Sequence, residues 1–294
     1  MIMLLRSSIA AVLLLAASTP LFGQSIDLSN VVAGDTIDNS TVIPDGSVIN
    51  LNGGSIASGT IFSAMDFPNG VTLNINDGTV GFGVEINNST INIDGGQVAV
   101  GATDLSEGVN NFNNTVTVTD GEVGGFFQLR GTSTLDLSGG SVESFGTLLD
   151  ATATVTGGSF GLVDNNGILN ISGGDFDTFR TFPVSSEVNL FGTDFAIDGV
   201  PITGLTLGQN LEITERNVTL TGTLSDGSTF SNFLDSTTPT SDLDFDPEPG
   251  VILPGFASGG STVSVTLVTP SVPEPNSMAL IVLASCGAMF RRRR

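Results

Sequence analysis

Four residue types are missing from this sequence, which contains no Trp, Tyr, His or Lys and has one cysteine, Cys286. The absence of His excludes Ser-His-Asp triads, His metal ligands and the commonest general base. The absence of Lys excludes Schiff-base catalysis. Cys286 lies in an apolar C-terminal segment, so the rest of the chain can form no disulfide, Cys-ligated metal site or Cys nucleophile. We therefore expect no catalytic and no cofactor-binding residues.

Positive charge is also scarce. Five of the eight basic residues lie near the ends, at Arg6 and at positions 291–294, which leaves Arg130, Arg180 and Arg216 for the body. Against these three arginines stand 29 acidic residues between positions 25 and 270, a net charge of −26. A field of this sign repels nucleic acid and anionic lipid, keeps an exported protein soluble and attracts cations. We expect no nucleic-acid partner.

Residues 1–24 have the pattern of a secretory signal peptide. Arg6 supplies a positive start, and residues 9–17 form an apolar stretch that is too short to span a bilayer as a stable helix. Small and turn-forming residues follow, and we expect cleavage near residues 23–25. This segment predicts export through the secretion machinery.

The C-terminal segment, residues 271–294, has three parts in a fixed order. A Val-Pro-Glu-Pro box comes first, the apolar run 277–290 follows, and four arginines end the chain. The residues of the box and of the arginine cluster are Val272, Pro273, Glu274, Pro275, Arg291, Arg292, Arg293 and Arg294. As a helix, the apolar run covers roughly 21 Å, which is short of a ~30 Å hydrocarbon core. An arginine cluster stays in the cytoplasm, so we expect a transmembrane helix with the body outside.

This three-part tail resembles the PEP-CTERM sorting signal of Gram-negative-type bacteria. The resemblance implies recognition by an exosortase, a membrane transpeptidase-like enzyme that cleaves near the Pro-Glu-Pro box. It also implies an inner-membrane intermediate, followed by release or attachment at the cell surface of a bacterium that makes exopolysaccharide. The alternative is an ordinary C-terminal membrane anchor, which has the same topology.

Between the two ends a short motif recurs: apolar, any, apolar, any, Gly or Asp, Gly, any, apolar. Its copies occupy residues 49–56, 73–80, 91–98, 116–123, 135–142, 153–160, 169–176 and, with Thr193 in place of the second Gly, 188–195. Successive copies begin 24, 18, 25, 19, 18, 16 and 19 residues apart. The alternating half of the motif predicts a half-buried strand, and the Gly pair predicts a turn into a second strand.

Periods of this length, all β and marked by Gly, predict a right-handed parallel β-helix over residues 25–195. Such a solenoid places Ile75, Ile93, Val118, Leu137, Val155, Ile171 and Leu190 in one internal ladder. The overall resemblance is to the Gly-rich β-helical ectodomains of PEP-CTERM proteins. The rival fold is an antiparallel sandwich or meander, in which turns would recur every 8 to 12 residues.

After residue 195 the motif stops. Residues 213–228 are typical of two strands joined by a hairpin turn at Asp226 and Gly227, and residues 263–268 alternate again. We expect residues 196–270 to form a small β-rich cap, because an open last coil would be an aggregation edge. Residues 235–255, rich in Pro, Thr and Asp, are expected to form a loop.

A glycan-active enzyme is the alternative function that the fold suggests, since many parallel β-helices are lyases or hydrolases of polysaccharides. A lyase would need a basic residue or calcium beside a uronate, and the repeats offer only Arg130 and Arg180. A hydrolase would need two carboxylates about 5 to 9.5 Å apart. The close pair Asp175 and Asp177 is expected to serve turn formation, and the usual sugar-stacking Trp and Tyr are absent.

One acidic run is a candidate calcium site. Asp242, Asp244, Asp246 and Glu248 alternate along the chain and could bind a hard cation such as Ca²⁺. An EF-hand loop is excluded because Pro247 stands where that loop needs Gly. The sequence thus predicts a non-enzymatic surface or matrix scaffold associated with exopolysaccharide, without a required cofactor. The alternatives are the glycan-active enzyme and a calcium-dependent adhesin or glycan-binding module.

Overall fold

We describe the protein from a computed structural model. It describes residues 27–38, 41, 43–44, 46–58, 61–62, 70–81, 83–99, 109–124, 127–181, 186–234, 256–257 and 262–270. The predicted signal helix, the loop 235–255 with its four calcium candidates, and the sorting tail 271–294 lie outside these residues.

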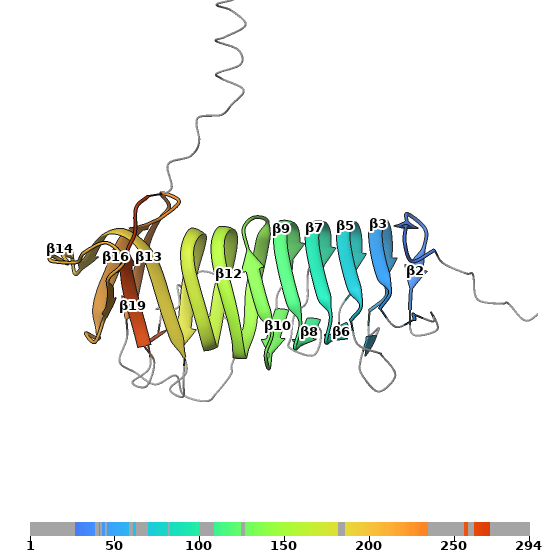
Figure 1. Cartoon of the computed structure of the whole chain (residues 1–294), viewed down its shortest axis with the longest axis horizontal. Helices are drawn as coiled ribbons and strands as arrows, with labels where there is room; N and C mark the ends of the chain where they lie inside the picture. The colour runs from blue at the N-terminus through green and yellow to red at the C-terminus, as the bar shows by residue number, and fades with distance from the viewer. Residues whose placement is uncertain are drawn as a thin grey trace, which may run out of the picture.

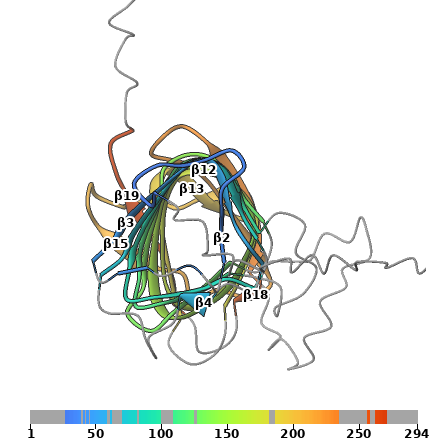
Figure 2. The same ribbon diagram turned by 90° about the vertical axis from the view of Figure 1, so that its right-hand side faces the viewer.

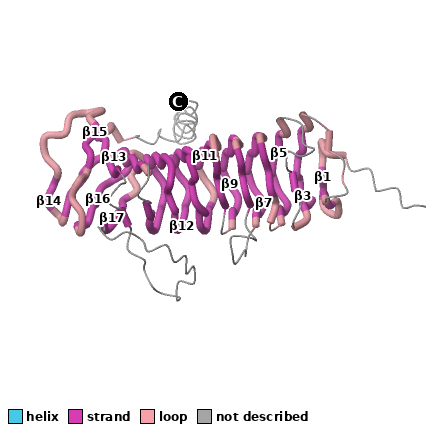
Figure 3. The backbone as a smooth tube through the Cα atoms, turned by 90° about the horizontal axis from the view of Figure 1, so that it is seen from below, coloured by secondary structure: helices cyan, strands magenta, loops and turns pink. Residues whose placement is uncertain are grey.

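Every regular element in this part of the chain is a β-strand, which confirms the all-β prediction (Figure 3). The strands are β1 (Val31–Val32), β2 (Thr36–Ile37), β3 (Val48–Ile56), β4 (Ile61–Phe62), β5 (Thr72–Val80), β6 (Glu85–Asn87), β7 (Thr90–Val98), β8 (Val109–Phe112), β9 (Thr115–Val123), β10 (Phe127–Arg130), β11 (Thr134–Leu137), β12 (Ser141–Thr181), β13 (Glu187–Ile197), β14 (Val200–Pro201), β15 (Asn210–Glu212), β16 (Val218–Leu224), β17 (Thr229–Leu234), β18 (Phe256–Ala257) and β19 (Thr262–Leu267). Across the described ranges we find no helix with the length and apolarity needed to cross a bilayer.

The alternating half of each motif copy and the residue before it form a five-residue stretch that we call a row, such as residues 72–76. Successive rows pair in parallel and in register. Ile75 lies opposite Ile93, and Ile93 opposite Val118, with the same register continuing through later copies. The column that results is Ile75, Ile93, Val118, Leu137, Val155, Ile171 and Leu190. All seven side chains are buried, so the predicted internal ladder is confirmed.

The rows lie side by side along an elongated body, from β3 near one end to β13 near the other (Figure 1). Viewed along the long axis, successive coils of the chain largely superimpose around a common interior (Figure 2). Apolar residues at alternate positions of every row fill that interior and form one continuous core. The pairing is parallel between rows, which excludes the antiparallel sandwich for this part of the chain.

The Gly positions differ from the prediction in one respect. The motif predicts two strands separated by a Gly turn in each copy, but β5 and β7 run through the Gly pair as single strands of nine residues. The register shifts at the turn, so the Gly pair forms a bulged corner within a strand. At Gly158 the backbone has φ +78, and an added Cβ would lie 2.8 Å from the Gly139 carbonyl oxygen. Corners of neighbouring coils therefore touch backbone to backbone.

Strand β12 is unusually long, at 41 residues. It contains two complete motif copies, whose starts at residues 153 and 169 are only 16 residues apart. Such short copies leave no room for loops between corners, and the chain stays paired with its neighbours throughout. Copy length therefore decides whether a coil carries loops, while the row register stays the same.

The C-terminal region both extends and closes the stack. Strand β19 pairs in parallel with β13, with Val263 opposite Val188 and Val265 opposite Leu190, so it forms a further row that the sequence had assigned to the cap. Strand β15 then pairs antiparallel with β19. Strands β16 and β17 form an antiparallel hairpin whose turn contains Asp226 and Gly227, as predicted.

The degenerate eighth copy has a structural reason. In earlier copies the second Gly of the corner lies against the corner of the neighbouring coil. In the eighth copy the equivalent residue, Thr193, pairs instead with Thr223 of the antiparallel strand β16. The positive φ moves to Asp194, at +55. Nearby, Phe160 and Phe176 stack at 5.3 Å between ring centroids, and Phe230 of the hairpin packs on Phe176 at 5.9 Å. Aromatic rings thus fill the core beneath the hairpin.

Candidate functional site

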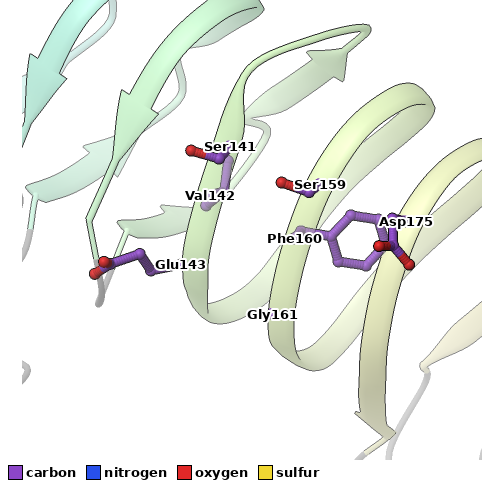
Figure 4. Close-up of a pocket in the computed structure, with 7 residues that line it drawn as sticks. All are labelled: Ser141, Val142, Glu143, Ser159, Phe160, Gly161 and Asp175. Atoms are coloured by element: carbon purple, nitrogen blue, oxygen red, sulfur yellow. The ribbon is translucent and has the colours of Figure 1, made fainter.

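A shallow groove of about 450 Å³ crosses three coils of β12, on the side of the body that follows the Gly corners (Figure 4). It is lined by Ser141, Val142, Glu143, Ser159, Phe160, Gly161 and Asp175. The groove exists because Gly161 has no side chain directly over the Glu143 backbone, where an added Cβ would lie 2.1 Å from the carbonyl oxygen. Phe160, only 3% exposed, belongs to the core beneath it.

The two carboxylates of the groove are badly placed for glycoside hydrolysis. Glu143 and Asp175 lie on coils that are separated by the coil of Ser159 and Gly161, and two coil steps amount to roughly 10 Å. The Glu143 side chain also points away from the coil that carries Asp175 (Figure 4). Retaining enzymes need carboxyl groups about 5–5.5 Å apart, and inverting enzymes about 6.5–9.5 Å. The groove offers neither geometry.

The basic residues of the body do not assemble a uronate clamp among the described side chains. Arg130 is half-buried and donates from Nη2 to the Gln128 side chain of its own strand. Arg216 donates to the carbonyl oxygens of Ile213 at 2.7 Å and Glu215 at 2.9 Å. The side chain of Arg180 is outside the description, as is that of Asp177.

The candidate calcium ligands lie outside the residues that the structure describes. Asp242, Asp244, Asp246 and Glu248 all lie in the range 235–255. Among the residues that are described, no three His, Cys, Asp or Glu side chains gather closely enough to hold an ion. The calcium hypothesis for the acidic run remains a prediction.

Among the described residues, Asp226 is the acidic side chain that accepts the most hydrogen bonds from backbone amides. Its carboxylate accepts hydrogen bonds from the Gly174 amide at 2.7 Å, the Ser228 amide at 2.9 Å and the Ser228 hydroxyl at 2.5 Å. Burial raises the pKa of Asp226, but the bonds from Ser228 and Gly174 outweigh it and hold this pKa below its usual value. One carboxylate therefore joins the β16–β17 hairpin to a corner of the stack.

This contact predicts a stability effect with a defined pH dependence. Asp226→Asn should lower the free energy of unfolding by about 1 kcal/mol at pH 7, a value reduced for solvent exposure. Because the folded-state pKa is depressed, the stabilisation is present above the ordinary value of 3.8 and disappears as pH falls through the folded pKa. Urea titrations at pH 7 and pH 3 should show the difference between the proteins shrinking at the lower pH.

The matched control is Asp136→Asn, on an exposed row position without a hydrogen bond to any described residue. It should change stability by less than about 0.5 kcal/mol at either pH. Equal effects of the two substitutions would show that Asp226 has no special role.

Columns of polar side chains on the outside of the rows were not recognised in the sequence. Asn74 Nδ2 donates to Asn50 Oδ1 at 2.7 Å, and Asn92 Nδ2 donates to Asn74 Oδ1 at 2.8 Å. A second column joins Asn76 to Asn52 at 2.8 Å. The signal was present as Asn at the same motif position in the first three copies, but its meaning depends on the register. These columns make the outer face of the rows the most regular polar surface among the described residues.

Comparison with known proteins gives no relative: no family model, no curated protein and no solved structure matches the chain. The groove, the arginines and the outer columns must therefore be interpreted from their own geometry.

Proposed function

We propose that this chain is an exported, non-enzymatic scaffold of a bacterial cell surface or extracellular matrix, processed by an exosortase. The observation that carries the proposal is the order of the tail: the Val-Pro-Glu-Pro box, the short apolar run and the arginine cluster. The signal-like residues 1–24 and the acidic, cysteine-free body are consistent with life outside the cell. Because the tail resembles the PEP-CTERM sorting signal, we propose that the protein is surrounded by exopolysaccharide.

We further infer that residues 25–195 form a right-handed parallel β-helix, with the following β-rich region as its cap. Parallel row pairing and the single buried ladder support a solenoid. The right hand follows from the strong preference of parallel crossover connections for that hand. Antiparallel pairing of β15 on β19 supports the cap, because it ends the parallel edge.

A scaffold role agrees with what the described side chains offer. The groove has no suitably spaced carboxylate pair, and Arg130 and Arg216 are bonded within their own segments. A rigid body with one continuous core suits a structural or spacing role outside the cell. None of these observations favours the glycan-active enzyme or the calcium-dependent adhesin.

The tail provides the decisive test. Pro273 and Pro275 lack amide protons and disfavour a helix, so the box should stay extended where an enzyme at the membrane surface can reach it. We expect the tail to be removed in a host with an exosortase and retained in an otherwise identical host without one. The measurement is the mass of the C-terminal peptide recovered from each host.

Two variants separate insertion from recognition. Deleting residues 291–294 should impair both membrane retention and processing, because the cytoplasmic anchor is lost. Glu274→Ala should impair processing while membrane insertion stays intact. Full-length tails of identical mass in both hosts would contradict the sorting proposal and leave an ordinary anchor.

A further inference from the structure

The outward side chains of five consecutive rows form a grid of hydroxyl and amide groups, which we call the Thr–Asx grid. The rows are residues 72–76, 90–94, 115–119, 134–138 and 152–156, paired in parallel and in register. The grid consists of Thr72, Asn74, Asn76, Thr90, Asn92, Asp94, Thr115, Thr117, Thr119, Thr134, Asp136, Ser138, Thr152, Thr154 and Thr156. Nine of these fifteen residues are Thr, and all fifteen are exposed or half-buried.

The composition of this face differs from that of the whole chain. The chain has a net charge of −22, yet the grid contains only two acidic residues, Asp94 and Asp136, which lie two rows apart. It contains no basic and no aromatic residue. Each bordering row begins with one exposed apolar side chain, Val48 at 49% and Ile168 at 38% exposure, and continues with uncharged polar side chains. The face therefore suits an uncharged ligand that makes hydrogen bonds, and it does not suit an anion or a stacked sugar ring.

Most of the threonine hydroxyls on this face are available to a ligand. Seven of them, on Thr72, Thr90, Thr115, Thr117, Thr134, Thr152 and Thr154, make no hydrogen bond to any residue the structure describes. In the column that contains Thr119, Ser138 and Thr156, the hydroxyls turn back toward the preceding row. Thr156, for example, donates to the Leu137 carbonyl oxygen at 3.4 Å. A free hydroxyl can both donate and accept, so the exposed columns can match either orientation of a bound water or hydroxyl.

The fold gives these hydroxyls a repeat in two directions. Neighbouring rows are about 4.8 Å apart, and outward positions along one row are two residues apart, or roughly 6.7 Å. The branched Cβ of threonine restricts χ1, so each hydroxyl and methyl has a preferred direction. Varying copy lengths leave the grid intact, because the register between rows is kept through all five.

We propose that the Thr–Asx grid binds the surface of ice. An ice surface is an uncharged, two-dimensional array of water molecules that repeats over distances of this order, and each molecule donates and accepts hydrogen bonds. Pre-ordered hydroxyls that are already spaced as a lattice bind without losing much side-chain freedom. The threonine methyls add apolar contact area between the hydroxyls. A single glycan chain would match one direction of the grid only, and the face has no aromatic ring on which a sugar could stack.

This inference does not depend on the sorting proposal, because ice binding needs the grid and not the tail. The test uses the purified protein in its exported form, slowly frozen so that a growing ice hemisphere either takes it up or excludes it. Ice recrystallisation is followed in parallel by microscopy. We expect the protein to enter the ice at least tenfold more than a non-binding protein of similar size, and to halt recrystallisation.

Three variants locate the activity. Thr134→Tyr places a large ring on an exposed grid position and should reduce ice uptake at least tenfold. Thr117→Val keeps the shape of the side chain and removes a central hydroxyl, and it should reduce uptake severalfold. Ser159→Tyr puts the same ring on an exposed position outside the grid and should leave uptake unchanged. Circular dichroism melting curves would establish that each variant is folded.

Several results would overturn the proposal. The first is exclusion of the wild-type protein from ice. The second is uptake that Thr134→Tyr and Thr117→Val leave unchanged while both variants remain folded. The third is binding to insoluble cellulose or chitin that Thr134→Tyr abolishes, without any uptake into ice, which would assign the grid to a polysaccharide surface.

Discussion

Replacing Val155 by aspartate is expected to lower the free energy of unfolding by several kcal/mol. Val155 is fully buried and lies opposite Leu137 in the internal column. A carboxylate there would have no partner, and an unpaired buried charge is among the most destabilising changes a core can receive. Urea denaturation followed by circular dichroism would measure the loss.

Thr154→Asp is the matched control for this substitution. Thr154 precedes Val155 in the same row but faces outward, where it is half-buried and water can solvate a new carboxylate. We expect a change below about 1 kcal/mol, which includes the repulsion from Asp136 directly opposite in the neighbouring row. A similar loss at both positions would mean that the two faces of the row are not distinguished as the structure describes.

Substitution of Gly158 by alanine is expected to destabilise the protein by at least ~2 kcal/mol, from two separate causes. The backbone has φ +78, which disfavours any residue with a Cβ. The added Cβ would also lie 2.8 Å from the Gly139 carbonyl oxygen and 2.9 Å from the Gly140 carbonyl oxygen, both on the neighbouring coil. Because those atoms belong to the backbone, relief would require the coils to move apart.

Gly208 allows the two causes to be measured separately. It has the same φ of +78, but an added Cβ would meet no atom within 4 Å. Gly208→Ala should therefore lose only the conformational part, about 1–2 kcal/mol. The additional loss in the free energy of unfolding of Gly158→Ala, compared with Gly208→Ala, measures the effect of the contact between coils. If both substitutions had equal effects on urea midpoints, close corner stacking would contribute nothing to stability.

The sequence was sufficient to predict the core of the fold. Alternation in the motif identified which side chains face inward, and aligning the copies placed Ile75, Ile93 and Val118 in one column. This succeeded because each copy is a local unit that pairs with the next, so the motif alone carries the register. The Gly pairs marked the corners correctly, although the strands continue through them.

Contacts between distant segments could not be predicted in this way. Strand β19 has no Gly corner, and nothing in its sequence shows that it pairs with β13 rather than with the cap. The bond from the Gly174 amide to Asp226 joins residues 52 positions apart. Such contacts depend on where the C-terminal region returns to the stack, which single-residue patterns do not encode.

Candidate sites were less predictable than the fold, for a related reason. The groove arises where Gly161 lies over Glu143, and the Thr–Asx grid appears only after five rows are aligned. Catalytic and metal-binding residue sets can be recognised as patterns in a sequence, whereas the groove and the Thr–Asx grid depend on regular spacing between coils. The calcium candidates and the sorting residues lie outside the described part of the chain and remain predictions.

The parallel register between rows also has a consequence for how this chain can change over generations. Because each row contacts mainly the row before and the row after it, one whole coil can be duplicated or lost and its neighbours will still find matching partners. Unequal recombination between the similar motif copies would supply such changes directly. The length of the body is thus a trait that selection can adjust one coil at a time, without redesigning the core.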